Sequence, residues 1–294
     1  MQASILIVSK NRKAELEFTL KVLERYLDLT IHEVLVFLDG CYDNSERLRI
    51  QFDWVKWVVS EKSIGASAAR QQLYPKAQGK FLIGLDDDAH PLNANFIMKT
   101  VCVFEMYPNA GIIAFQEIKG VFDSDYEALE KVDIKVEEYY TNEFIGCGFA
   151  IRKDVYLTTK GFPVWIDIYG EESCVSMEVL ANGYDMIYSN TVKVNHRVNI
   201  SDRKLNGQNY FRFGKQLKNT TYYYLVYYPF PLVKILKLYQ HNFRKYAIMD
   251  RIYFKVFLKT IFEVMKGTPS VMKYRSPVDK KVLKKLKGLH GLKY

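Results

Sequence analysis

The chain has 294 residues, 49% of them hydrophobic and 26% charged, a composition that excludes a disordered protein and allows one large domain with an appendage. Its formal net charge of +9 is concentrated at one end, because residues 251–294 hold twelve Lys or Arg against two acids. A nucleic-acid enzyme usually carries its basic residues around the working site, so we expect no nucleic-acid partner and consider an anionic membrane surface the better candidate for the C-terminal region.

Short apolar runs alternate with helical patterns over the first two hundred residues, which is typical of a mostly parallel sheet covered by helices. The N-terminal part predicts strands at 4–8, 34–38, 55–60 and 81–85, and helices at 16–27 and 66–76. These strands are too apolar for a sheet with a wet face, so we expect the sheet to be central. The strand that begins at Ser4 leaves no room before it for a signal core.

Further along, the pattern predicts a helix at 96–107, an acidic excursion at 121–140, a helix at 171–180, and strands at 111–115, 146–151 and 184–189. Residues 210–265 are helical in pattern, yet no stretch reaches the ~20 apolar residues of a spanning helix. We therefore predict a catalytic domain at 1–205, with a nucleotide-binding half (1–90) and an acceptor-side half (91–205). A helical, basic C-terminal region follows at 206–294.

The four cysteines lie far apart, without the paired spacing of a zinc site or a disulfide framework. This usage fits a reducing compartment. We expect a cytoplasmic protein that is either free or peripheral at the cytoplasmic face of the membrane.

Three consecutive carboxylates, Asp86, Asp87 and Asp88, follow directly on the predicted strand at 81–85. Open α/β sheets bind their ligands at the carboxyl ends of strands, and carboxylates with phosphate oxygens are the ligands that Mg²⁺ and Mn²⁺ prefer. Because side chains alternate along a strand, Asp86 and Asp88 can face the same side. The alternative is an acidic loop that caps the next helix.

Two other strand ends carry polar loops, and a run of small residues opens the helix at 66–76. Ser9, Asn11 and Arg12 follow the first strand, where a guanidinium can bind a diphosphate. Asp39 follows the second strand and can accept hydrogen bonds from a base or a ribose. Gly65 precedes the helix and Arg70 lies one turn inside it, so the small residues serve either ligand approach or close packing of the helix on the sheet.

The order of these blocks resembles the nucleotide-binding half of family 2 glycosyltransferases, which have the GT-A fold. The blocks are Val8-Ser9-Lys10-Asn11-Arg12, Leu38-Asp39-Gly40-Cys41-Tyr42-Asp43, Ile64-Gly65-Ala66-Ser67-Ala68-Ala69-Arg70, Leu85-Asp86-Asp87-Asp88, Phe144 to Arg152, Gly161-Phe162-Pro163 and Tyr169-Gly170-Glu171-Glu172. The resemblance covers roughly residues 3 to 200. The family's second loop more often reads Gly-Ser-Thr-Asp, so the base of the donor stays open.

The resemblance implies an inverting, metal-dependent transfer of a sugar from a nucleotide diphosphate donor, a UDP- or dTDP-sugar, to a saccharide or lipid-linked saccharide, as in surface polysaccharide synthesis. It implies Asp88 as ligand of Mn²⁺ or Mg²⁺, and Glu172 as general base with Glu171 beside it. The donor-binding residues that we expect are Ser9, Asn11, Arg12, Asp39, Gly65, Arg70, Asp86 and Asp87.

His196 follows the last predicted strand and, as the corresponding histidine does in relatives of the fold, can bind the metal or the diphosphate. A lone histidine is as often a hydrogen-bonded residue without a ligand. Arg197 and Arg203 are further cations that could meet a phosphate after loop closure. For Glu171 and Glu172 the alternative is favourable charge at a helix N-terminus.

An apolar stripe at helical spacing, Val278, Val282, Leu286 and Leu289, runs among five lysines near the C-terminus. Such a helix lies either in a membrane interface or on the catalytic domain. The aromatic residues between Tyr222 and Phe230 favour the interface.

Two other functions remain as alternatives. A nucleotidyltransferase that makes nucleotide sugars would show a glycine-rich loop after the first strand, where this chain has no glycine between Ser9 and Arg12. A noncatalytic membrane-binding protein would explain the basic end of the chain but not the three carboxylates.

Overall fold

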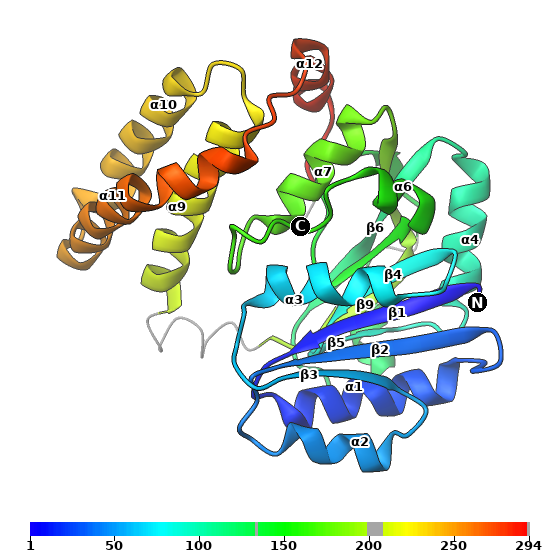
Figure 1. Ribbon diagram of the computed structural model, residues 1–294. Helices are drawn as coiled ribbons and strands as arrows, with labels where there is room; N and C mark the ends of the chain where they lie inside the picture. Colours follow the sequence, from blue (N-terminus) through cyan, green and yellow to red (C-terminus); the bar gives the residue numbers. More distant parts are fainter. Residues whose placement is uncertain (133–134, 199–207, 293–294) are drawn as a thin grey trace.

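The computed structural model describes residues 1–132, 135–198 and 208–292. Among these residues, nine strands form one mixed sheet in the order β3-β2-β1-β4-β8-β6-β9-β5, with β7 paired to β9. Figure 1 shows helices on both faces of this sheet and a group of long helices to one side of it. A central mixed sheet with a helical C-terminal region confirms the predicted architecture.

The N-terminal half of the sheet is parallel throughout. It consists of β1 (Ala3–Ser9), β2 (His32–Asp39), β3 (Lys56–Ser60) and β4 (Phe81–Asp86). Val8 lies opposite Asp86 and Ser9 opposite Leu38, so the carboxyl ends of β1, β2 and β4 meet at one edge of the sheet. One prediction is wrong in detail: β3 is an edge strand and is partly exposed, so this strand is not fully buried as its apolar run predicts.

The second half of the sheet is mixed. Its strands are β5 (Ala89–Pro91), β6 (Ala110–Lys119), β7 (Glu138–Tyr140), β8 (Gly148–Arg152) and β9 (Asp185–His196). β8 runs antiparallel between β4 and β6, whereas β6 and β9 are parallel. β6 and β9 are both longer than their apolar runs predict, because their pairing resumes after a β-bulge and continues through polar residues to the pair Lys119 and His196.

Helices cover both faces of the sheet. Ile5 and Ile7 of β1 pack with α1 (Lys13–Tyr26), α2 (Leu48–Gln51) and α4 (Phe96–Met106), whereas Leu6 packs with α3 (Ala66–Leu73), α6 (Lys153–Thr158) and α7 (Glu171–Ala181). The alternation along one strand thus supplies two cores. The remaining short elements are 3₁₀ turns at Ser45–Arg47 and Tyr74–Lys76, and α5 (Asp125–Glu130) in the acidic excursion.

The C-terminal region consists of helices. They are α9 (Gln208–Tyr227), α10 (Leu232–Asn242), a π-helical turn (Phe243–Ala247), α11 (Arg251–Val271), a 3₁₀ turn (Met272–Tyr274) and α12 (Lys280–Gly288). α9 and α11 pack against each other, and Figure 1 places them with α10 beside the sheet. The predicted domain boundary after residue 205 lies outside the described residues. No helix within the described ranges has the length and hydropathy needed to cross a bilayer.

Of the two alternatives for the stripe at 278–289, the structure shows packing on the catalytic domain. Val282, Leu286 and Leu289 contact the core that covers one face of the sheet. Asn142 Nδ2 donates to the carbonyl oxygen of Leu289 at 3.3 Å, and Lys285 Nζ lies 2.7 Å from a carboxylate oxygen of Asp185. α12 therefore uses its apolar stripe within the protein.

Candidate active site

The three consecutive carboxylates diverge at the end of β4. Asp86 extends toward Arg70, whose Nη2 lies 2.8 Å from Asp86 Oδ1. Asp87 is buried and accepts a hydrogen bond from Ser9 Oγ at 2.7 Å. Asp88 is also buried, with Arg12 Nη2 at 2.6 Å from Oδ2. Burial, together with the charge of Asp88, raises the pKa of Asp87 to about 7 against the effect of Arg12.

Asp86, Asp88 and His196 place three ligand atoms within 4.8 Å of one another. Apart from His196 Nε2 at 3.3 Å, the buried Oδ1 of Asp88 has no partner among the described residues. A buried carboxylate oxygen without a hydrogen-bond donor is costly unless a cation satisfies it. Two carboxylates and an imidazole therefore fit a divalent cation of the Mn²⁺ type, in which oxygen ligands predominate.

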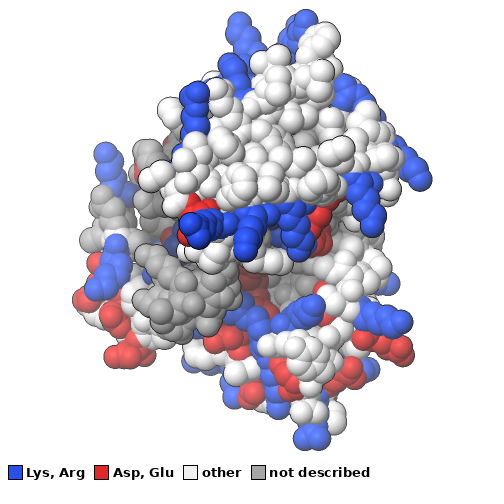
Figure 2. Space-filling model, turned by 90° about the vertical axis from the view of Figure 1, so that its left-hand side faces the viewer, with Lys and Arg blue, Asp and Glu red and all other residues white. Residues whose placement is uncertain are grey.

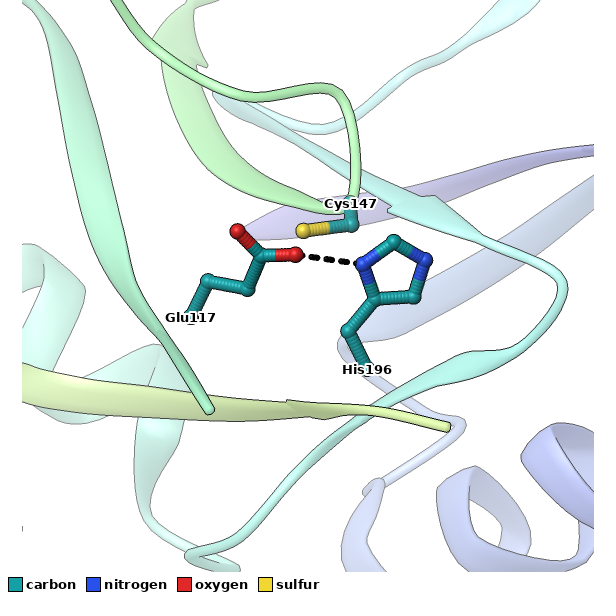
Figure 3. A group of neighbouring side chains, drawn as sticks. All are labelled: Glu117, Cys147 and His196. Carbon is teal, nitrogen blue, oxygen red and sulfur yellow. Dashed lines mark hydrogen bonds and ion pairs between the residues drawn. The ribbon is translucent and has the colours of Figure 1, made fainter. Parts of the chain in front are cut away.

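His196 is held from behind by a residue that the sequence analysis missed. Glu117 Oε1 lies 2.5 Å from His196 Nδ1, and Figure 3 shows Glu117, Cys147 and His196 facing one another. A neutral His196 with its proton on Nδ1, directed at Glu117, would turn the lone pair of Nε2 toward Asp88, which is the arrangement of a metal-binding histidine with a carboxylate behind it. Burial raises the pKa of Cys147 to about 12, so this thiol stays protonated.

We expect Glu117→Gln to weaken Mn²⁺ binding ~10–100-fold, because the imidazole loses the charge that orients it and raises its basicity. Titration of Mn²⁺ against the full chain, followed by the electron paramagnetic resonance of the free ion, measures this. Glu105→Gln, an exposed acid on α4, is the matched control and should leave the affinity unchanged. Equal Mn²⁺ affinities of the two variants would show that Glu117 does not support metal binding by His196.

Arg70 connects the carboxylates of β4 with the acid pair that begins α7. It is 7% exposed, and its Nη1 lies 2.8 Å from Glu171 Oε1 and 3.9 Å from Glu172 Oε1. Gly146 makes room for this contact, since a Cβ there would lie 2.7 Å from Glu172 Oε1 and 2.8 Å from Arg70 Nη2. Residues far apart in the sequence, Asp86 and Glu172, thus share one buried cation.

The two acids of α7 differ in accessibility. The Glu171 side chain is 3% exposed and bonded to Arg70, whereas that of Glu172 is 22% exposed. Burial and the charge of Glu172 raise the pKa of Glu171 to about 8, and burial raises the pKa of Glu172, with Arg70 opposing both shifts. Glu172 is the one of the pair that a hydroxyl group from solvent can reach.

The loop after β1 has the backbone of a tight turn. Asn11 adopts a left-handed conformation (φ 55°) and its Oδ1 accepts a hydrogen bond from the backbone N–H of Tyr42 at 2.8 Å. Arg12 is 40% exposed while it bonds Asp88. Asn11 therefore shapes the loop, and Arg12 borders both the carboxylates and solvent.

The loop after β2 is held by its own carboxylate. Asp39 is buried and accepts hydrogen bonds from the backbone of Ile64 at 2.6 Å and of Gly65 at 3.1 Å, and from Ser63 Oγ at 2.7 Å. Gly65 has φ +90°, and a Cβ there would lie 3.1 Å from the backbone oxygen of Asp167. The structure thus gives Asp39 and Gly65 a part in holding two loops together, and their contact with a donor stays a prediction.

Arg197 lies at the site but is committed to the protein: its Nε bonds Glu15 at 2.9 Å and its Nη2 bonds Thr19 at 2.9 Å. A contact of Arg197 with phosphate would break both bonds. Arg203 lies outside the described residues.

Comparison with known proteins connects this geometry to one family. The sequence model described as glycosyl transferase family 2 matches residues 4–156. The chain has no match among curated proteins.

Three solved structures share the fold. GalNAc-T7 with UDP, GalNAc and Mn²⁺ superposes with a TM-score of 0.56 and 18% identity over 68% of this chain and 43% of that one. Residues 1–349 of TarS from S. aureus superpose with a TM-score of 0.50 and 15% identity, over 65% of this chain and 61% of that one. For the mannosyltransferase PcManGT from Pyrobaculum calidifontis, in complex with GDP-Man and Mn²⁺, the TM-score is 0.58 and the identity 15%, over 99% of this chain and 76% of that one. The chain thus spans less than two thirds of the first two proteins' length, and at these identities the likeness concerns the fold.

Proposed function

Because the chain belongs to glycosyl transferase family 2 and has the GT-A fold, we propose that it transfers a sugar from a nucleotide diphosphate donor to a hydroxyl of a saccharide or lipid-linked saccharide, with inversion at the anomeric carbon. The observation that carries the proposal is Arg70, which bonds both Asp86 and Glu171. The same guanidinium lies 3.9 Å from Glu172, so one side chain connects a candidate cation ligand with the candidate general base.

On the donor side, Asp88, His196 and Asp86 would hold Mn²⁺ or Mg²⁺. When bound, this cation neutralises the diphosphate and stabilises its departure without a proton. Arg12 bonds Asp88 in the structure and is 40% exposed. Arg12 would exchange this ion pair for a phosphate oxygen of the donor when the cation site is occupied.

On the acceptor side, Glu172 takes the proton of the attacking hydroxyl, because it is the more accessible member of the acid pair. A general base must come within ~3 Å of that hydroxyl, on the face of the sugar opposite the leaving diphosphate. Glu171 stays paired with Arg70 and positions it between Asp86 and Glu172.

We place the enzyme in the cytoplasm, peripheral at the cytoplasmic face of the membrane. Four free cysteines and the basic C-terminal region support this location. A UDP- or dTDP-sugar is the expected donor. A lipid-linked saccharide, as in surface polysaccharide synthesis, is the acceptor that such a location favours.

Incubation of the full chain with UDP-, dTDP-, GDP- and CDP-sugars and Mn²⁺ tests the function. We expect release of one nucleoside diphosphate, accelerated by a saccharide acceptor, with an anomeric proton coupling in the product that reports inversion. Release of pyrophosphate from a nucleoside triphosphate and a sugar phosphate would instead identify a nucleotidyltransferase. A product that retains the donor's configuration would contradict the role of Glu172 as base.

A further inference from the structure

Large apolar side chains stand exposed along the two helices α10 and α11. The row on α10 continues into the π-helical turn, and the row on α11 follows helical spacing. We call the two rows together the hairpin surface. Its residues are Leu232, Leu236, Phe243, Phe254, Leu258, Phe262 and Met265. Leu236 is 70% exposed and Phe262 is 71% exposed. The rings of Phe243 and Phe254 lie 6.5 Å apart, which joins the two rows. A contiguous exposed apolar patch marks a binding surface rather than ordinary exterior.

Basic side chains border this surface. The segment from α10 to α11, residues 232–271, has eight Lys or Arg against Asp250 and Glu263, a net +6. A depression of about 400 Å³ on α10 and the π-helical turn is lined by Lys237, Gln240, His241, Arg244 and Lys245. Figure 2 views this side and shows a broad area without charged side chains in its upper part, edged by Lys and Arg, with acids gathered in the lower part.

We propose that the hairpin surface binds an anionic lipid bilayer, with its apolar side chains at the boundary of headgroups and acyl chains and the basic depression around a lipid phosphate. Apolar burial and attraction to anionic lipid add together at such an interface. A second copy of the chain is a poorer occupant, because two hairpins of +6 would face each other with like charge. We therefore assign the membrane contact to α10 and α11 and not to α12, whose partly buried stripe packs against the catalytic domain.

The position of α9 connects this surface with the active site. α9 packs on α11, Asn219 of α9 donates to the carbonyl oxygens of Ile168 and Tyr169 at 2.8 Å, and Lys215 bonds Asp167. These contacted residues, 167–169, lie just before Glu171 and Glu172 in the chain. Docking therefore holds the acceptor side of the site in a fixed relation to the lipid surface, a consequence that rests on the proposed function, whereas the docking itself does not.

Co-sedimentation of the full chain with vesicles tests the proposal. Phosphatidylcholine vesicles that contain phosphatidylglycerol should bind the protein, and phosphatidylcholine alone should bind it far less. The double variants Leu236→Glu/Phe262→Glu and Lys237→Glu/Arg244→Glu should each need ~10-fold more anionic lipid for half binding, or more. Ile50→Glu, which alters an 87% exposed apolar residue on α2, should bind like the unchanged chain.

Binding of both double variants equal to that of the unchanged chain would overturn the proposal, as would a chain that ignores anionic vesicles. Self-association without lipid that Leu236→Glu/Phe262→Glu abolishes would assign the surface to a second copy and would also overturn it. Because the hairpin surface lies apart from the cation site, nucleotide binding by the same variants should not change. That readout separates failure of the membrane proposal from failure of the proposed enzyme.

Discussion

Asp88→Ala should abolish metal-dependent donor binding and lower turnover by ~10³-fold or more. Asp88 contributes one oxygen to the candidate cation site and lies against both Arg12 and the second ligand, His196. A bound metal ion contributes several kcal/mol of transition-state stabilisation, and about 4 kcal/mol corresponds to that factor. Turnover of the nucleotide sugar and calorimetric titration of nucleoside diphosphate with Mn²⁺ measure the two effects.

Asp88 is buried, so its loss could also disturb folding, and two variants separate these effects. Asp88→Asn keeps the size of the side chain and should lose the metal while it keeps its melting temperature within a few degrees. Asp53→Ala removes an exposed carboxylate away from the site and should behave like the unchanged chain. Metal-dependent donor binding by a folded Asp88→Asn enzyme would show that the cation is held elsewhere.

Glu172→Gln should lower turnover by ~10²–10⁴-fold and leave donor binding intact, because the amide keeps the shape of the side chain but cannot accept the proton. Glu171→Gln should act differently. Its carboxylate bonds Arg70, and its loss should disturb the positions of Asp86 and Glu172, with a smaller fall in turnover and a lower melting temperature. A fully active Glu172→Gln enzyme would transfer the role of base to another residue.

The pH dependence of turnover gives a second test of Glu172. A base acts when it is deprotonated, so turnover falls as the pH drops through its pKa. Burial raises the pKa of Glu172 above its ordinary value of 4.5, so the acidic limb of the profile should lie above pH 4.5. An acidic limb at or below pH 4.5 would contradict Glu172 as the base.

Much of this site could be predicted because parallel strands bring their carboxyl ends together. Ser9, Asp39 and Asp86 end β1, β2 and β4, and a reader of the chain needs only the strands and their direction to place the three loops at one edge. The recurrence of small residues before Arg70 likewise marks the start of α3. Local pattern sufficed wherever one element defined a residue's position.

The other contacts of the site depend on which strands pair and which helices pack together. Glu117 lies beyond the apolar run of β6, and only the pairing of β6 with β9 brings it behind His196. The sequence predicts Arg70 as a donor-binding residue, but the packing of α3 near α7 surrounds it with three carboxylates. Glu117 is a carboxylate that continues an apolar strand, and this position is the signal that could have identified it from the sequence.

The C-terminal region shows the same limit. An apolar stripe among lysines, as in α12, satisfies a membrane interface and a protein core equally well, and contacts of Leu286 and Leu289 decide for the core. The exposed rows on α10 and α11 have similar composition and remain outside. Periodicity identifies an apolar face, whereas tertiary packing determines whether that face is covered.

Thermal unfolding of the full chain with UDP, dTDP, GDP and CDP, each with and without Mn²⁺, tests the central claim most directly, because a ligand that binds the folded chain raises its stability by mass action. We expect stabilisation by one of these nucleotides that requires the metal and disappears in Asp88→Asn. The absence of any shift at millimolar nucleotide and metal, in a chain that unfolds cooperatively, would contradict a nucleotide-sugar site at Asp86, Asp88 and His196.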